Sequence, residues 1–249
     1  VAFLDPDDSY HTDYIKVMAE VMESEKADLV VCRYTVLYAD RPPGLFRKEV
    51  AYPPLKAGAY ARREALGALV DGTINVSVWN KLYRSKLWDS IRFPEGHNYE
   101  DLDIMFRIFD ICGSIQVLDQ MLYYHLRRPG SITDTMSEAN VRDVILAKSH
   151  FEEYVRANTP AVFSFEKLNK VRQATLYGQI VSYVRYSGKN CDLNETFLES
   201  IRTQIIGKGG ELGLVHMSLR GKAAYLMMLR CPDLLKAVYP AYHAVRMLV

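Results

Sequence analysis

The sequence predicts an α/β protein followed by a helical region. Within residues 1–34, an apolar run, an amphipathic helical pattern and a second apolar run follow one another. Strand, helix and strand in that order form a crossover unit, which is typical of α/β sheets. From residue 139 onward, helical periodicity replaces the strand-like runs. We therefore expect an α/β part over residues 1–138 and a helical part over 139–249.

Composition and charge restrict the kinds of protein that this chain can be. Its 249 residues, 49% hydrophobic and 24% charged, suit a soluble globular protein of one large or two small domains. A net charge of +1 gives no support for nucleic-acid binding. The 4 cysteines form no Cys-x-x-Cys pair, so we expect buried free thiols in a reducing, cytoplasmic compartment rather than a zinc site. No apolar run reaches membrane-spanning length, and no signal peptide is visible.

The first elements follow from apolar spacing. Residues 1–4 are expected to form a buried strand, and "ADLVVCRY" (27–34) a second strand covered on both faces. Between them, Thr12 suits an N-cap and Asp13 a first helical turn. The helix that follows presents an apolar face formed by Ile15, Met18, Ala19 and Met22.

The rest of the first half alternates between loops and short elements. Residues 38–58, rich in Pro, Gly and charges, predict a surface excursion, and 62–72 predict a helix. Residues 75–83 begin like a strand and 84–91 like a helical turn. Residues 99–113 predict a helix, 114–128 two short strands, and 128–133 a loop. In the second half, the helical patterns are clearest over residues 140–158, 165–188, 194–205 and from 219 onward.

Three acids crowd the end of the first apolar run, in the segment "DPDD" (residues 5–8), called the acid turn below. Carboxylates this close repel one another unless a cation or a shared proton relieves them. Asp5 and Asp7 alternate and therefore point the same way, at the edge where open α/β sheets bind ligands. Mg²⁺ or Mn²⁺ shared with substrate phosphates would suit them. The alternative is a purely structural turn before a helix.

Two further segments carry polar groups into apolar surroundings. Glu100 and Asp101 stand at the start of a helix, where one acid can cap while the other faces a pocket as a general base. His97 is a less favoured candidate for the same role. Asn80 and Lys81 interrupt an apolar stretch and either face solvent or reach into a cleft.

A basic turn closes the α/β part. Arg127, Arg128 and Ser131 surround a Pro-Gly pair, and arginine forks with a hydroxyl suit phosphate oxygens. His125 is either a third metal ligand or a core residue, and the core is favoured.

The order and spacing of these segments resemble the family 2 glycosyltransferases of the GT-A fold. The resemblance rests on the acid turn, "VWNKLYRSKL", "FPEG" with "EDLD", and "LYYHLRRPGSIT", and it covers residues 1 to about 135. It implies a partial GT-A (Rossmann-like) sheet with flanking helices. It also implies an inverting hexosyltransferase-type enzyme that moves a sugar from a nucleotide-sugar to a glycan or lipid-linked acceptor, as in polysaccharide biosynthesis.

The same resemblance assigns roles to the residues. Asp5 and Asp7 match the Asp-x-Asp motif that holds Mg²⁺ or Mn²⁺ on the donor diphosphate, with Asp7 as the main ligand. Asp101 matches the catalytic base, beside Glu100. The donor-binding positions are Asp5, Asn80, Lys81, Arg128 and Ser131.

Two other functions stay open at this point. A phosphatase of the haloacid-dehalogenase type would use Asp5 as nucleophile and Asp7 as acid. A truncated, non-catalytic module would bind a partner through its helices. The family usually has a nucleotide-binding segment before Asp-x-Asp, so we expect that this chain is a fragment lacking it. The apolar residues 234–249 suit either core packing or a peripheral contact with a membrane surface.

Overall fold

The computed structural model describes residues 1–38, 56–128, 137–186, 195–212, 219–231, 233–234 and 237–238. Most of the excursion predicted over residues 38–58, and the loop residue Ser131, lie outside these ranges. The chain divides into two compact units, residues 1–135 and 136–249, and each is described by itself.

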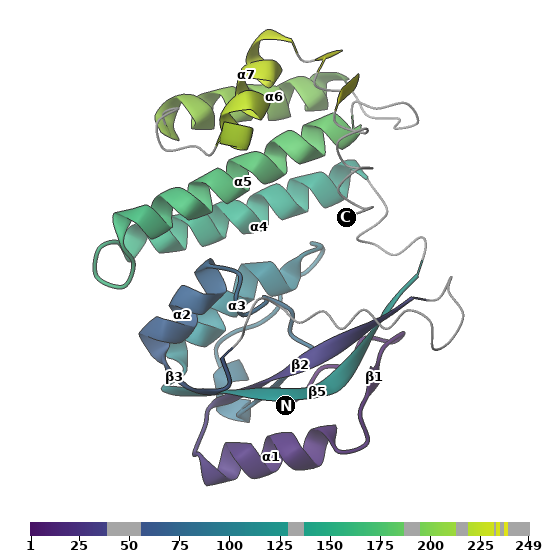
Figure 1. The fold of residues 1–249 in the computed structure, drawn as a ribbon, viewed down its shortest axis with the longest axis vertical. Helices are drawn as coiled ribbons and strands as arrows, with labels where there is room; N and C mark the ends of the chain where they lie inside the picture. The colour runs from purple at the N-terminus through teal and green to yellow at the C-terminus, as the bar shows by residue number, and fades with distance from the viewer. Residues whose placement is uncertain are drawn as a thin grey trace. The chain divides into compact units, whose positions relative to one another are not determined.

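The first unit is an α/β fold in which helices cover both faces of a mixed β-sheet, which confirms the predicted fold class. The strand order is β1 (Ser9–Tyr10), β5 (Ser114–Arg127), β2 (Leu29–Tyr38), β4 (Lys81–Tyr83), and β3 (Gly58–Ala61) also pairs with β5. Strands β2 and β5 run parallel, and the other pairs are antiparallel. Helix α1 (Tyr14–Ser24) covers one face, and α2 (Arg62–Val70) and α3 (Glu100–Ile111) cover the other (Figure 1).

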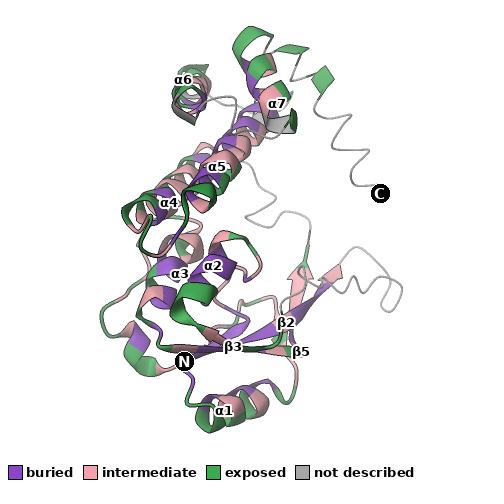
Figure 2. Ribbon diagram, turned by 60° about the vertical axis from the view of Figure 1, so that its left-hand side comes forward, coloured by how far each residue is buried: buried purple, intermediate pink, exposed green. Residues whose placement is uncertain are grey.

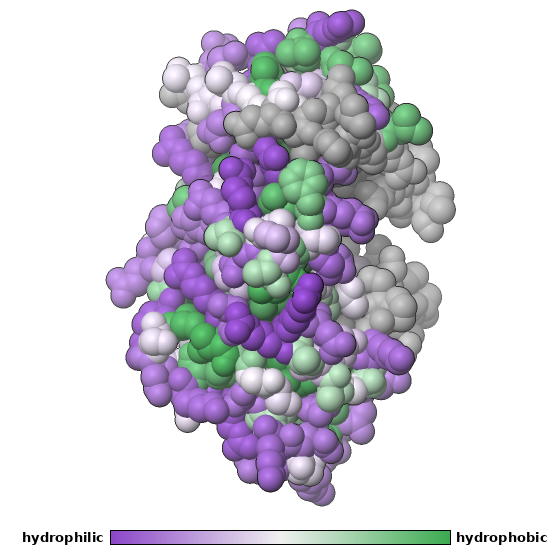
Figure 3. Space-filling model, turned by 90° about the vertical axis from the view of Figure 1, so that its left-hand side faces the viewer, coloured by the Kyte–Doolittle hydropathy of each residue, from purple (hydrophilic) through white to green (hydrophobic). Residues whose placement is uncertain are grey.

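The buried side chains explain why these elements form. Strand β2 is buried over most of its length, as Figure 2 shows, because helices cover both of its faces. Helix α1 buries Tyr14, Met18 and Met22, spaced four residues apart. The expected face was partly wrong, because Ile15 is 52% exposed. On the side visible in Figure 3, apolar side chains appear in small groups among hydrophilic ones.

Four local predictions differ from the structure. Residues 75–80, where the sequence predicts the start of a strand, form none, and β4 begins only at Lys81. Residues 1–4 are not a buried strand: Ala2 makes one isolated bridge to Leu82, and Val1 and Leu4 are about half exposed. The N-cap of α1 is Asp13 rather than Thr12, and it makes no side-chain capping bond. Residues 114–127 form one strand, not two, with register irregularities opposite Val31–Tyr34.

The second unit is helical, as predicted. It contains α4 (Glu138–Ala157), α5 (Phe165–Tyr186), α6 (Glu195–Leu212) and α7 (Leu219–Arg230), and α5 packs against each of the other three. Its core includes Val141, Leu176, Ile180, Ile205, Tyr225 and Met228. The nearly buried carboxylate of Glu152 on α4 pairs with Arg156, Arg172 and Lys208, so it links α4 to α5 and α6. Within the described ranges, none of the helices is long and apolar enough to cross a membrane.

Candidate active site

The acid turn is fastened to β5 through its third carboxylate. The backbone N–H of Asp8 donates to the Asp5 carbonyl at 3.1 Å, which closes the turn. The Asp8 side chain is fully buried and accepts hydrogen bonds from the Tyr123 hydroxyl at 2.6 Å and the Leu126 N–H at 2.7 Å. His125 Nδ1 lies 3.1 Å from the same carboxylate. Burial alone would raise the pKa of Asp8, but these hydrogen bonds hold it below its ordinary value.

The other two acids of the turn have fewer hydrogen-bond partners in the protein than Asp8. Asp5 is half-buried, and burial followed by the charges of Asp8 and Asp7 raises its pKa. The Asp7 carboxylate accepts a hydrogen bond from Arg128 Nε at 2.8 Å, in a pair that is partly open to solvent. This turn therefore carries more negative charge than its protein neighbours neutralise, which is the electrostatic setting that favours a bound cation.

A second cluster of acids, Glu100 and Asp101, lies at the start of α3. Burial, assisted by the charge of Glu100, raises the pKa of Asp101 to about 6. Asp101 Oδ1 accepts a hydrogen bond from the Leu102 N–H at 2.7 Å, while Glu100 is exposed. The charge of Asp5 also raises the pKa of Asp101, so the acid turn and the α3 N-terminus lie within electrostatic reach of each other.

The residue before this acid pair has an unusual backbone. Tyr99, the N-cap of α3, adopts a left-handed conformation with φ 61° and ψ 31°. For a bulky residue this conformation is strained, and such strain gathers at functional sites. The conformation of Tyr99 could not be predicted from the sequence, since nothing in the residue type signals a positive φ.

Asn80 and Lys81 lie inside the first unit rather than on its surface. The Lys81 side chain is fully buried, and Nζ donates to Asn80 Oδ1 at 2.9 Å and to Asn75 Oδ1 at 2.8 Å. Asn80 Nδ2 donates to the Cys32 carbonyl at 2.8 Å. Of the two placements that the sequence left open for Lys81, solvent exposure is therefore wrong.

Aromatic rings connect this buried region to the acid turn. Trp79 stacks on Tyr123, with ring centroids 4.4 Å apart, and on His125 at 5.3 Å. Both partners also bind Asp8, so His125 helps to hold the turn. Its side chain is 29% exposed, so the favoured core position is only partly correct. The role of Tyr123 was not predicted, although its alternation with His125 along the strand places both side chains on one face. His97 is exposed.

The carboxylates can be compared with the needs of a divalent metal. Among the described residues, no three His, Cys, Asp or Glu side chains come together as a ready metal cage. Mg²⁺ commonly takes only one or two protein carboxylates and completes its shell with phosphates and water. Asp5 and Asp7 fit this smaller set.

Sequence relatives give an independent comparison. No protein-family model matches the chain. Over 154 residues it is 23% identical to the glycosyltransferase GlyA of Streptococcus pneumoniae, which covers 60% of this chain and 22% of GlyA. Over 132 residues it is 29% identical to EpsH of Bacillus subtilis, itself provisionally named a glycosyltransferase, which covers 50% of this chain and 36% of EpsH. The matches span well under two thirds of either relative.

Solved structures of TarS from S. aureus are also similar. TarS 1–349 in complex with UDP-GlcNAc gives a TM-score of 0.43 at 17% identity, with 92% of this chain and 55% of that chain covered. The complex with UDP gives a TM-score of 0.39 at 16% identity, with 85% of this chain and 47% of that chain covered.

Proposed function

We propose that this chain carries part of the catalytic domain of an inverting, metal-dependent glycosyltransferase of family 2 with the GT-A fold. The donor would be a nucleotide-sugar, and the acceptor a hydroxyl of a glycan or a lipid-linked sugar. One observation carries the proposal: Asp5, in the undercompensated acid turn, lies within electrostatic reach of Asp101, whose pKa is raised to about 6. The similarity to two proteins named as glycosyltransferases supports it.

On the donor side, Asp7 and Asp5 would hold Mg²⁺ or Mn²⁺. When bound, the metal would neutralise charge on the nucleoside diphosphate leaving group. Arg128, which pairs with Asp7 at 2.8 Å, would also bind the donor diphosphate. Its guanidinium suits a diphosphate oxygen, and it would exchange the carboxylate for the phosphate when the donor enters. Ser131 follows it in the sequence as a further phosphate contact.

On the acceptor side, Asp101 would take the proton of the attacking hydroxyl. A base works best when its pKa lies near the working pH, and a carboxyl with a pKa of about 6 is mostly ionised at neutral pH yet more basic than an ordinary aspartate. Glu100 raises that basicity through its charge. A single displacement at the anomeric carbon, with one base and no covalent intermediate, would invert the configuration.

The proposal is tested by calorimetric titration of the protein, expressed from its complete reading frame, with Mn²⁺ and a panel of nucleoside diphosphates. We expect binding of one nucleotide only when the metal is present. Asp7→Asn should weaken it by at least about tenfold, because contacts to a charged group are worth roughly 1.5–3 kcal/mol. Asp89→Asn, an exposed aspartate at the end of a short helix, is the matched control. Equal binding by the wild type and Asp7→Asn would contradict the proposal.

The membrane contact predicted from the sequence falls on residues 234–249, most of which lie outside the described residues. We also propose a cytoplasmic protein that makes peripheral contact with an anionic membrane surface through α7, the described helix that precedes them. Leu219, Leu226 and Leu229 on this helix are exposed, its charged residues are all basic, and Arg230 lies in its last turn. Exposed leucines beside basic residues suit the boundary between acyl chains and anionic headgroups. Sedimentation with anionic vesicles should exceed that with zwitterionic vesicles, and Leu226→Asn should reduce it. Equal sedimentation with both vesicle types would refute this contact.

A further inference from the structure

A buried lysine organises the loop that precedes it. Besides the two asparagine oxygens, Lys81 Nζ donates to the backbone carbonyls of Asn75 at 3.0 Å and Ser77 at 2.5 Å. Four oxygens from residues 75–80, called the 75–80 loop below, therefore surround one nitrogen. Without a cation there, these oxygens would be buried with too few donors, which is costly in a protein interior.

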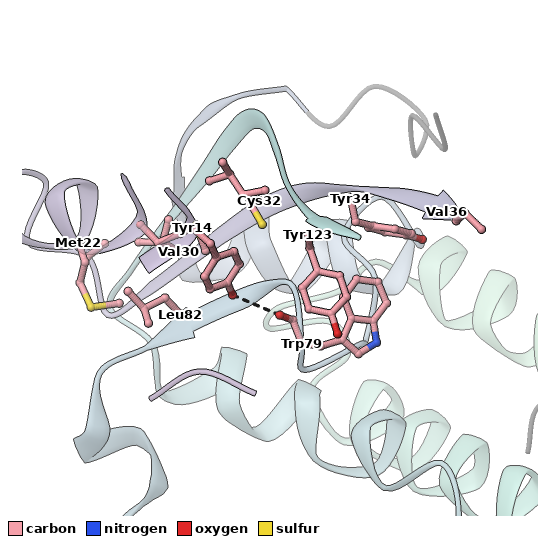
Figure 4. Close-up of a cluster of buried hydrophobic side chains, with 12 residues drawn as sticks. Tyr14, Met22, Val30, Cys32, Tyr34, Val36, Trp79, Leu82 and Tyr123 are labelled. Carbon is pink, nitrogen blue, oxygen red and sulfur yellow. Dashed lines mark hydrogen bonds between the residues drawn. The ribbon is translucent and has the colours of Figure 1, made fainter. Parts of the chain in front are cut away.

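The far side of the same loop is held by other fixed donors. The Tyr14 hydroxyl donates to the Trp79 carbonyl at 3.2 Å (Figure 4), and the Tyr83 hydroxyl donates to the Val78 carbonyl at 3.0 Å. The Cys32 N–H donates to the Asn80 carbonyl at 3.0 Å. The path of the loop is thus determined by side chains from α1 and β4 and by the backbone of β2, with Lys81 as the only charged donor among these contacts.

The loop holds Trp79 against β5, the strand to which the acid turn is fastened. Figure 4 shows the rings of Trp79 and Tyr123 side by side, and the Trp79 ring also stacks on His125 with only 7° between their planes. Tyr123 and His125 in turn bind Asp8. A change in the 75–80 loop would therefore move the aromatic support of the acid turn.

Lys81 also acts on the other half of the site. Burial lowers the pKa of Lys81 to about 7, and the nearby charge of Asp101 opposes this effect. In return, the Lys81 ammonium lowers the pKa of Asp101, while burial, Glu100 and Asp5 raise it. The two groups therefore stabilise one another's charged forms.

We propose that Lys81 is a positioning residue that fixes the 75–80 loop through its ammonium and thereby holds Trp79 under the acid turn. The same charge helps keep Asp101 in the form that accepts a proton. The second statement rests on the proposed function, whereas the first depends on the fold alone. Lys81 therefore need not contact the donor.

The test uses Lys81→Met, which keeps an unbranched side chain one atom shorter and removes its donors, and Lys16→Met on α1 as an exposed control. Both are made in a Trp88→Phe background, so that fluorescence reports Trp79 alone. We expect Lys81→Met to shift the emission to the red and to increase quenching by acrylamide. Asn75→Ala, which removes one of the four oxygens, should give a smaller change in the same direction. This variant replaces Lys81→Met in the test if Lys81→Met does not fold.

A pH profile of kcat/KM separates positioning from a general loss of structure. In Lys81→Met the acid limb should move upward by about one pH unit, as expected when a nearby opposite charge is lost. An unmoved limb together with unchanged Trp79 emission would overturn the proposal, as would an equal response of Lys16→Met. If the wild type binds no nucleotide, the proposed function fails, while Trp79 emission still decides whether Lys81 positions the loop.

Discussion

Removing only the hydroxyl of Tyr123 tests how the acid turn is held. Tyr123→Phe keeps the ring that stacks on Trp79 and deletes the 2.6 Å hydrogen bond to the Asp8 carboxylate. The acceptor is charged and its side chain is fully buried, so we expect the free energy of unfolding to fall by roughly 1.5–3 kcal/mol at neutral pH. Asp8 would keep the Leu126 N–H and His125 as partners.

Denaturant unfolding followed by tryptophan fluorescence measures this loss, because the chain has 2 tryptophans, Trp79 and Trp88, and both lie in the first unit. The pKa of Asp8 is depressed in the folded state, so its contribution is present above the ordinary value of 3.8 and is lost as pH falls through the folded pKa. The effect of Tyr123→Phe should shrink in that same range. Tyr124→Phe is the neighbouring control, and a cost below about 0.5 kcal/mol for Tyr123→Phe, or an equal cost for both, would refute the reasoning.

Three further predictions follow from the site and from the helical unit. The kcat/KM for sugar transfer should rise with pH through about 6, and Asp101→Asn should lower it by roughly 10²–10⁴-fold; a pH-independent rate would contradict the assigned base. Arg128→Gln should weaken nucleoside diphosphate binding yet strengthen binding of Mn²⁺ alone by up to about fivefold in calorimetry, because an exposed ion pair is worth up to about 1 kcal/mol. Gly209→Ala should destabilise the helical unit in thermal unfolding followed by circular dichroism, because its Cβ would lie 2.0 Å from the Tyr225 ring, whereas Gly210→Ala meets nothing within 4 Å and should be neutral or stabilising.

The helices and the central strand could be predicted because their signals are local. Helices α1, α2 and α3 lie where the sequence placed them. Strand β2 overlaps the strand predicted over residues 27–34 but continues to Tyr38. It could not be predicted that residues 1–4 form no regular strand, because their pairing depends on β4, about eighty residues away. Strand β4 pairs with them at one bridge. It likewise could not be predicted that β5 is one strand rather than two, because its continuity depends on pairing with β2 across the irregular stretch.

Part of the site could also be anticipated. The crowded acids do raise the pKa of Asp5, and Asp101 is less exposed than Glu100. The prediction that one acid caps the helix while the other faces a pocket is not confirmed, since the N-cap residue is Tyr99. The buried position of Lys81 could not be anticipated, because it depends on carbonyls that only the folded loop brings together. The catalytic, donor-binding and metal roles of these residues stay predictions that the experiments above test.

The pairing of β5 has a consequence for how the first unit is made. Strand β5 pairs with β2 along one edge and with β3 and β1 along the other. A ribosome releases β1, β2 and β3 long before residues 114–127, so only the β2–β4 pair can form early. Contacts of such large sequence separation form slowly and leave strand edges open meanwhile. The nascent chain should therefore depend on protection by chaperones until its central strand emerges.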